Sequence, residues 1–277
     1  MPEIACVNGE FMPLEQATVS VEDRGYQFAD AVYEVIRTYR GRPFAVEEHL
    51  ARLFRSLDAI HLKHSYQAEW LKSLIAEAIQ RAGFAETLVY LQISRGVAPR
   101  HRRIPDHYTP TLVMTAREMH DTTDFCQRGV SVITVPDNRW GRCDIKTVAL
   151  LPNVLAYRTA REAGAHDAIF VGENSAIYEA TAANVFIVRK GELHTPPEGP
   201  KILSGITRGK ILRAARAVNI HATERPIPRS ELLAADEAFL CSTTAEVVPI
   251  VAVDGQTIGR GPLAERIYQK FLDMFTT

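Results

Sequence analysis

The sequence has no excess of either charge and no long apolar run, and both absences exclude broad classes of protein. Its 277 residues include 32 basic and 33 acidic side chains, which leave a net charge of −1. Nucleic-acid binding usually requires a clustered excess of positive charge, so we expect no nucleic-acid partner. No apolar run approaches the roughly 20 residues of a membrane-spanning helix, and the N-terminus lacks the basic-then-apolar pattern of a secretory signal. We therefore expect a cytoplasmic protein without a membrane segment.

Cysteine is scarce, and its spacing excludes two common kinds of site. The four cysteines, Cys6, Cys126, Cys143 and Cys241, are far apart and form no C-x-x-C pair. This spacing does not fit a zinc ribbon, and a disulfide framework is unexpected in a chain of this size. His61 and His64 are close in sequence but lack a third ligand nearby, so we expect no metal site. The 46% hydrophobic content is sufficient for one large or two medium domains.

The first half of the chain has the pattern of an α+β domain. An Asn8-Gly9 pair between short apolar runs predicts a hairpin, because both residues tolerate a positive φ. Apolar residues at helical spacing predict two amphipathic helices, the second of which ends at Gly83. The expected strands are 31–39, 87–94 and 111–117, and the expected helices are 46–60 and 67–82.

The second half follows a polar stretch without periodicity at 117–128, where we place the domain junction. The predicted domains are therefore residues 1–119 and 120–277. An Asp254-Gly255 pair indicates a further hairpin near the C-terminus. The expected strands are 130–135, 168–171, 184–188 and 238–241, and the expected helices are 153–164, one that begins after Gly205–Thr207, and 262–274.

Lysine is also scarce, and arginine supplies most of the positive charge. The seven lysines are Lys63, Lys72, Lys146, Lys190, Lys201, Lys210 and Lys270. Lysine can lose its proton and form an imine with an aldehyde, whereas arginine effectively cannot. Lys146 differs from the others because it directly precedes an apolar run, where its ammonium would be partly desolvated. Position alone favours a lysine that reaches solvent from the end of a strand, with an imine-forming lysine as the alternative.

Two short segments and one arginine could bind a phosphate. Ser204–Thr207 precedes a predicted helix whose first amides would face an anion, and Gly205 would allow close approach of the backbone. Ser242–Thr244 offers three hydroxyls and successive amides at the end of a strand. Each segment also fits a plain helix cap. Arg52 lies outside the apolar stripe of the first predicted helix, so its position favours an exposed side chain.

Glu179 and one basic cluster are the remaining candidates. Glu179 is a single carboxylate among small and apolar residues, where an unpaired charge is costly, so we expect a positive or protonated partner. Arg100–Arg103 is the one dense basic cluster, in a segment shaped by Gly96, Pro99 and Pro105. Such a cluster fits a solvated loop, and its forked donors also suit a carboxylate or phosphate ligand.

These candidates occur in an order that is typical of one family. The chain carries Asp23–Val35, Glu48–Leu53, Cys143–Ala156, Glu179–Phe186, Gly205–Arg208 and Ser242–Glu246. Together these segments resemble the motifs of the fold-type IV pyridoxal-phosphate aminotransferases, and within them the D-amino-acid aminotransferases. Ala29 and Ala31 stand where members often have glycine. The resemblance extends over nearly the whole chain and replaces the simpler interpretations given above for the single segments.

The resemblance implies a fold and an assembly. The fold would be of the α/β class, with an α+β small domain over 1–119 and a larger α/β pseudo-barrel domain over 120–277 that carries the cofactor lysine. The site would lie at the domain interface. The cofactor would be pyridoxal 5'-phosphate, with amino acids and 2-oxo acids as substrates. The protein would be a homodimer, because in the D-amino-acid enzymes the arginine loop reaches in from the neighbouring subunit.

The resemblance also implies a role for each site residue. Lys146 would be the Schiff-base lysine and the base that moves the α-proton between Cα and C4′. Glu179 would pair with the pyridine nitrogen and keep it protonated. The phosphate would be held by Arg52, Ile206, Thr207 and Thr243. The substrate would be bound by Tyr33, Arg100, Arg102 and Thr244, with the α-carboxylate at Tyr33 and the two arginines.

One departure concerns substrate handedness. The D-amino-acid subgroup usually has Arg-x-His in the arginine loop, whereas this chain has Arg100-His101-Arg102. The expected reaction is transamination of D-alanine or D-glutamate with 2-oxoglutarate or pyruvate. The alternatives are a branched-chain L-amino-acid aminotransferase, an (R)-amine transaminase, an aminodeoxychorismate lyase and a catalytically idle cofactor-binding protein. The Arg100 loop favours the D-amino-acid reading, and the presence of both Lys146 and Glu179 argues against an idle site.

Overall fold

The computed structural model describes residues 3–120 and 123–276, and the chain forms two compact units. Unit 1 comprises Met1–His120 together with Ile145–Ala149. Unit 2 comprises Asp121–Asp144 and Leu150–Thr277. Among the helices of the described residues, none is long and apolar enough to cross a membrane. All four cysteines are free thiols.

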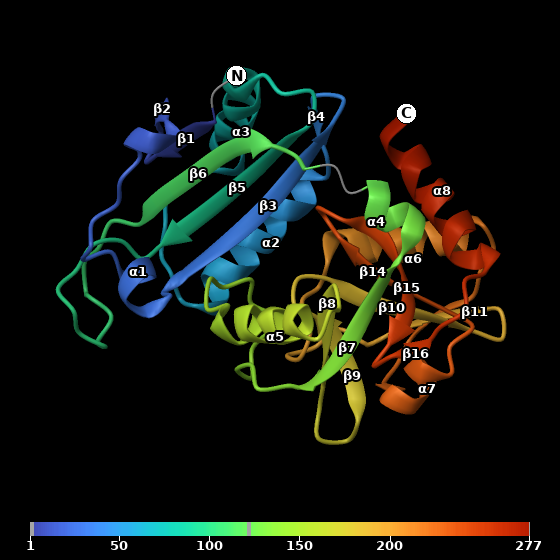
Figure 1. Cartoon of the computed structure of the whole chain (residues 1–277). Coiled ribbons are helices and arrows are strands. Elements are labelled where there is room, and N and C mark those ends of the chain that lie inside the picture. The colour runs from blue at the N-terminus through green and yellow to red at the C-terminus, as the bar shows by residue number, and fades with distance from the viewer. Residues whose placement is uncertain (1–2, 121–122, 277) are drawn as a thin grey trace. The chain divides into compact units, whose positions relative to one another are not determined.

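Unit 1 is built on an antiparallel six-stranded sheet in the order β2-β1-β6-β5-β3-β4. Helices α2 and α3 pack against this sheet through their apolar stripes (Figure 1). The expected hairpin is confirmed, since Asn8 and Gly9 have φ values of 52° and 95°. The strands are β1 (Ile4–Val7), β2 (Glu10–Pro13), β3 (Ala31–Tyr39), β4 (Arg42–Pro43), β5 (Thr87–Ser94) and β6 (Thr111–Glu118). The helices are the 3₁₀ turn η1 (Leu14–Gln16), α1 (Arg24–Phe28), α2 (Val46–Ala59) and α3 (Ala68–Ala82).

The segment Ile145–Ala149 belongs to unit 1 by its contacts, although we expected Lys146 in the C-terminal domain. The Tyr33 N–H donates to the Lys146 carbonyl at 2.9 Å, and the Thr147 hydroxyl donates to the Ala31 carbonyl at 3.0 Å. Ile145 is part of the apolar core between the sheet and its helices. The reason is non-local: the segment pairs with β3, more than a hundred residues earlier, so local sequence patterns do not reveal the contact.

Unit 2 is built on a ten-stranded mixed sheet that closes on itself. Its path is β12-β11-β10-β14-β15-β7-β8-β9-β13, and β16 pairs with β15. An additional pairing of β9 with β10 joins strands that are distant along this path, so six strands from β10 to β9 form a closed ring. This ring is the pseudo-barrel that the resemblance implied.

The elements of unit 2 follow in chain order. The strands are β7 (Val130–Pro136), β8 (Asp167–Val171), β9 (Ala176–Ala180), β10 (Asn184–Arg189), β11 (Glu192–Thr195), β12 (Ala222–Glu224), β13 (Ile227–Pro228), β14 (Glu237–Ser242), β15 (Glu246–Val253) and β16 (Gln256–Thr257). The helices are α4 (Thr123–Arg128), α5 (Leu151–Glu162), α6 (Ile206–Ala217), α7 (Arg229–Leu233) and α8 (Pro262–Thr276).

Several short elements were not predicted from the sequence. The polar stretch at 117–128 contains the short helix α4, and Glu179 lies on β9, which has only five residues. Such elements are too short for a periodic apolar pattern, and their stability depends on neighbours in the sheet rather than on local propensity. Helix α5 begins at Leu151, earlier than expected, with Pro152 in its first turn.

Candidate active site

Lys146 is held beside Tyr33 by the backbone of the Ile145–Ala149 segment. Its Nζ lies 4.2 Å from the centroid of the Tyr33 ring, within the range of a cation–π contact. The backbone N–H of Lys146 donates to Oγ of Ser56, a residue of helix α2, at 3.3 Å. The flanking Ile145 and Thr147 are buried, whereas Lys146 is partly exposed. The lysine is therefore fixed at its backbone while the residue as a whole stays partly exposed, which is compatible with a nucleophilic role.

Arg52 is buried on α2, so the exposed position that its sequence context favoured is wrong. Its Nε and Nη2 nitrogens donate to the two carboxylate oxygens of Glu34, each at 2.7 Å. His49 Nδ1 lies 2.8 Å from Glu34 Oε2. Glu34 and His49 are buried as well. A forked pair of charge-assisted hydrogen bonds fixes the plane of the guanidinium, so Glu34 orients Arg52.

Sequence analysis missed Glu34, although a signal was present. In β3 the buried positions alternate, and Glu34 is in phase with the buried Val32 and Ile36. A carboxylate at an inward-facing position of a strand needs a charged partner. Burial opposes ionisation of Glu34, but the charge and hydrogen bonds of Arg52 and the contact with His49 outweigh it and lower the Glu34 pKa to about 2.

We expect Glu34→Gln to destabilise the protein strongly, because it leaves the buried Arg52 without its carboxylate. Breaking one partner of a buried ion pair typically costs about 3–5 kcal/mol. Urea unfolding of the variant, followed by circular dichroism, measures this loss. The matched control is Glu162→Gln, whose pair with Arg158 is solvent-exposed and should change the unfolding free energy by less than about 1 kcal/mol.

The same pair predicts an acid dependence. Because the folded pKa of Glu34 lies below its unfolded value near 4.5, its contribution is complete above pH ~4.5 and declines as pH falls toward about 2. The wild type should lose stability in this window, and Glu34→Gln should show a shallower loss. Equal slopes for the two proteins would contradict the assignment.

The basic residues Arg100 and Arg102 lie in the loop that joins β5 to β6, residues 95–110, which we name the β5–β6 loop. Both side chains are exposed. Arg100 donates from NH1 to the Gln27 carbonyl at 3.2 Å, and its guanidinium carbon lies 4.7 Å from the centroid of the Phe28 ring. The structure thus places Arg100 against helix α1.

Glu179 lies in unit 2 where β9 pairs with β10 and closes the ring of strands. Its Oε2 accepts from the Leu203 amide at 3.0 Å and from Asn184 Nδ2 at 3.3 Å, and its Oε1 accepts from Arg139 NH1. Glu179 therefore has the positive partner that its sequence context required.

Arg139 was not singled out from the sequence, because nothing in its neighbourhood marks it. Its Nε lies 2.9 Å from Asp137 Oδ1, and its NH2 also donates to the Lys201 carbonyl at 2.9 Å. Burial disfavours the charge of Arg139, but the hydrogen bond with Asp137 and the charge of Glu179 raise its pKa. The Arg139 charge in turn favours ionised Glu179.

The first residues of helix α6 lie next to this carboxylate network. The helix begins at Ile206, so the amides of Ile206 and Thr207 have no partner within the helix. A Cβ on Gly205 would lie 2.0 Å from Asn184 Oδ1, so only glycine allows this close approach. Asn184 donates both to Glu179 and to the Leu203 carbonyl, at 3.3 and 3.0 Å. One amide side chain therefore couples the position of Glu179 to the start of α6.

Thr243 and Thr244 follow β14 and lie near the same end of the sheet. Asn184 is paired in register with Glu179 on one side and with Cys241 on the other, so the turn after Cys241 and Glu179 lie at the same end of the sheet, with β10 between them. The Ser242 hydroxyl accepts from the Ala245 amide at 3.1 Å and lies 3.3 Å from Thr244 Oγ1.

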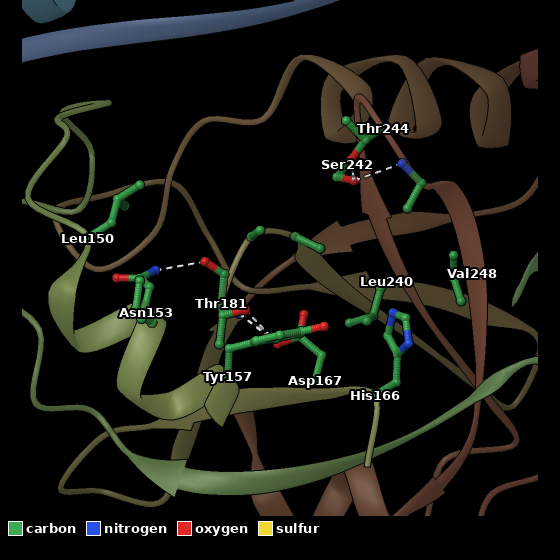
Figure 2. A pocket seen from close by; sticks show the side chains of 14 residues that line it. Leu150, Asn153, Tyr157, His166, Asp167, Thr181, Leu240, Ser242, Thr244 and Val248 are labelled. Atoms are coloured by element: carbon green, nitrogen blue, oxygen red, sulfur yellow. Dashed lines mark hydrogen bonds between the residues drawn. The ribbon is translucent and has the colours of Figure 1, made fainter. Parts of the chain in front are cut away.

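Thr244 also lines a cavity of about 390 Å³ within unit 2, bounded by α5 and β14 (Figure 2). The volume is typical of small-molecule sites. Asn153 Nδ2 donates to the Thr181 carbonyl at 2.7 Å, and the Thr181 hydroxyl donates to Asp167 at 2.6 Å. Burial raises the pKa of Asp167 despite its hydrogen bonds from Thr181 and from the Ala168 amide. The cavity thus has an apolar wall and a hydrogen-bonded polar edge.

The structure brings the candidate residues together in two groups. In unit 1, Lys146 lies beside Tyr33 and contacts α2 at Ser56, one turn after Arg52. In unit 2, Glu179, the start of α6 and the turn after β14 share one end of the barrel sheet. Arg100 and Arg102 form a third feature, on the β5–β6 loop of unit 1.

Comparison with known proteins identifies the family. The family model for amino-transferase class IV matches residues 31–253. The chain is 40% identical to a D-alanine aminotransferase of Bacillus licheniformis, over 94% of this chain and 93% of that protein. It is 36% identical to a D-alanine aminotransferase of Staphylococcus haemolyticus, over 96% and 95%.

Solved structures of similar fold include branched-chain aminotransferases. The enzyme of Thermoproteus uzoniensis superposes with a TM-score of 0.89 at 28% identity, over 98% of this chain and 94% of that one. The Escherichia coli enzyme gives 0.92 at 26% identity, over 99% and 95%. The family model and the relatives each cover most of the chain. The chain therefore belongs to the class IV aminotransferases.

Proposed function

We propose that the protein transfers the amino group of D-amino acids, such as D-alanine and D-glutamate, to a 2-oxo acid such as 2-oxoglutarate or pyruvate. The observation that carries this proposal is the 40% identity to a D-alanine aminotransferase over nearly the full length of both chains. The arginine-rich β5–β6 loop supports the same conclusion, because its exposed guanidiniums suit a carboxylate.

We further propose that pyridoxal 5'-phosphate is the cofactor, and the residues present fit it. Two related branched-chain aminotransferase structures contain pyridoxamine 5'-phosphate or a phosphopyridoxyl-glutamate compound. In this chain, Lys146 is a partly exposed lysine, and Glu179 is a carboxylate held in place by Arg139, Asn184 and the Leu203 amide. The Gly205 backbone, which a Cβ would obstruct, precedes two helix-start amides suited to a phosphate.

The roles of the chain's own residues follow from their contacts. When bound, the cofactor supplies an aldehyde that links to an amine and a ring that withdraws electrons. Lys146 would supply the amine for this link and, once free, would move the proton between the substrate Cα and C4′ of the cofactor. Ionised Glu179 would favour a proton on the ring nitrogen.

The remaining residues bind the two anionic ends. The phosphate would be held by Arg52, Ile206, Thr207 and Thr243. Glu34 orients Arg52 for this task, because its two hydrogen bonds fix the guanidinium plane. The substrate is bound by Tyr33, Arg100, Arg102 and Thr244.

Branched-chain L-amino-acid transamination is the alternative, because the structural neighbours include enzymes of that name at 26–28% identity. The higher identity of the D-alanine aminotransferases, 36–40%, favours the D-amino-acid reaction. An enantiomer-resolved screen of amino donors with 2-oxoglutarate distinguishes the two. We expect D-alanine and D-glutamate to react and their L-enantiomers to fail.

Arg100→Ala should lower kcat/KM for D-alanine by at least about tenfold, since a charge-assisted contact to a carboxylate contributes about 1.5–3 kcal/mol. Arg102→His, which restores the usual order of the subgroup, should have a milder effect. Steady-state kinetics of both variants with both enantiomers measures this. A wild type that prefers L-leucine or L-valine over every D-amino acid would overturn the D assignment.

We also propose a homodimer in which the β5–β6 loop of one protomer completes the site of its partner. A complementation experiment tests this arrangement. When Lys146→Ala and Arg100→Ala proteins are unfolded and refolded together, each heterodimer gains one site with both native residues. Random pairing should therefore restore about a quarter of the sites. If the loop acts within its own subunit, every site keeps one defect and mixing restores no activity.

A further inference from the structure

The β5–β6 loop has a rigid base and an exposed tip. At the base, Arg95 is buried and donates to both carboxylate oxygens of Asp30, at 2.8 and 2.9 Å. The loop then turns at Gly96, whose φ is 92° and where a Cβ would lie 1.9 Å from the Thr109 carbonyl oxygen. At the tip, Arg100 and Arg102 are exposed. If Arg100 is to bind a substrate in one position, contacts must hold the exposed tip of the loop in place relative to its rigid base.

Arg24, at the start of α1, spans that distance. Its side chain is buried, and its Nε donates to Asp30 Oδ2 at 2.8 Å. Its NH1 donates to the carbonyl of His101 at 2.7 Å and lies 3.5 Å from the carbonyl of Arg103. One guanidinium therefore connects the carboxylate at the base of the loop to the backbone on either side of Arg102.

Phe28 makes a second contact with the tip. The guanidinium carbons of Arg24 and Arg100 lie 4.9 and 4.7 Å from the centroid of the Phe28 ring. Two like charges are thus held against one aromatic ring, which offsets part of their repulsion through cation–π attraction. Arg100 is also tied to α1 by its bond to the Gln27 carbonyl.

We propose that Arg24 and Phe28, named here the Arg24–Phe28 clamp, position the β5–β6 loop so that Arg100 and Arg102 receive the substrate carboxylate. This inference deepens the proposed function and rests on it, since that function makes these arginines the carboxylate site. Arg24 is a positioning residue, because it is buried and its Nε and Nη1 donate to Asp30 and to loop carbonyls. The fork of arginine suits this task, because Asp30 and the loop carbonyls bind two different nitrogens of one guanidinium, whereas an ammonium has all its donors on a single nitrogen.

The decisive variant is Arg24→Met, which keeps the bulk of the side chain and leaves the Arg95–Asp30 pair in place. We expect the KM for D-alanine to rise about tenfold or more through loss of orientation, while the visible absorption of the bound cofactor is unchanged. Propionate, a carboxylate without an amino group, should bind more weakly to the variant than to the wild type, as measured by titration calorimetry. Amides 100–104 should exchange hydrogen faster. Arg24→Lys should resemble Arg24→Met, because charge alone does not restore the fork.

Arg103→Met is the matched control, because it also removes one positive charge, but from the β5–β6 loop itself, and leaves the clamp in place. Arg103 pairs with Asp106 at the surface, where both side chains are mostly exposed. Wild-type propionate affinity and KM in Arg24→Met would overturn the clamp, and so would an equal loss in Arg103→Met. If Arg24→Met does not fold, Phe28→Leu decides the question: it should weaken propionate binding and speed exchange at 100–104, and wild-type behaviour would overturn the proposal.

The two hypotheses can fail separately. A wild type that transaminates no D-amino acid, yet binds propionate in a manner that depends on the clamp, would overturn the proposed function and keep the clamp. If the wild type is active on D-alanine, but its KM and propionate affinity do not depend on the clamp, the clamp would be overturned and the proposed function kept.

Discussion

Lys146→Ala should abolish transamination, with a loss in kcat of about 10⁴-fold or more, as removal of a covalent catalytic group typically causes. The reason is chemical: alanine has no amine to link to the cofactor aldehyde or to carry the α-proton. The protein should remain folded, because Ile145 and Thr147 keep the segment packed on β3. Steady-state kinetics, together with borohydride reduction and peptide mass spectrometry of the cofactor adduct, measures both roles.

Lys201→Ala is the matched control for this experiment. Lys201 is exposed and lies over the Tyr178 ring at 6.0 Å, so its amine is available to solvent but has no role in the proposed reaction. This variant should retain wild-type kcat and the adduct at Lys146. A borohydride-stable adduct on another lysine in Lys146→Ala would show that the covalent lysine was wrongly assigned.

The sequence predicted most of the longer elements because their signals are local. The stripe of Leu50, Leu53 and Leu57 predicted α2, and all three are buried in the unit 1 core. The Asn8-Gly9 hairpin followed from φ preference alone. Such patterns depend on the period of one helix or strand and on the chemistry of one turn, so no knowledge of distant residues is needed.

The site was harder to predict because its geometry depends on distant partners. The apolar stripe of α2 left Arg52 on the polar side, yet Glu34 on a neighbouring strand draws the guanidinium into the interior. Arg139 and Arg24 were not recognised as site residues, because the contacts that matter, with Glu179 and with the His101 carbonyl, are distant in sequence. Motif resemblance identified Lys146 and Glu179 as candidates, but the residues that orient the site emerge only from the fold.

The surroundings of Glu179 determine what its carboxylate can do. Three donors from Arg139, Asn184 and the Leu203 amide stabilise the ionised form and hold it in one orientation. The closing contact of β9 with β10 fixes the backbone on which it lies. A carboxylate held in this way is a preorganised negative charge, whose effect on a nearby protonated ring nitrogen requires no further rearrangement.

Glu179→Gln should therefore leave the cofactor bound and slow the proton-transfer step about 10²- to 10³-fold, because a neutral amide cannot stabilise a protonated ring nitrogen. The fold should survive, since Arg139 keeps its hydrogen bonds to Asp137. Stopped-flow single-turnover kinetics with α-deuterated and ordinary D-alanine measures the step.

The matched control is Glu237→Gln. Glu237 is another buried carboxylate of unit 2, and it accepts from the Leu263 and Ala264 amides at the start of α8. It should lower the melting temperature without slowing proton transfer. Wild-type single-turnover rates in Glu179→Gln would remove this residue from the proposed role, because the neutral amide would then serve as well as the charge.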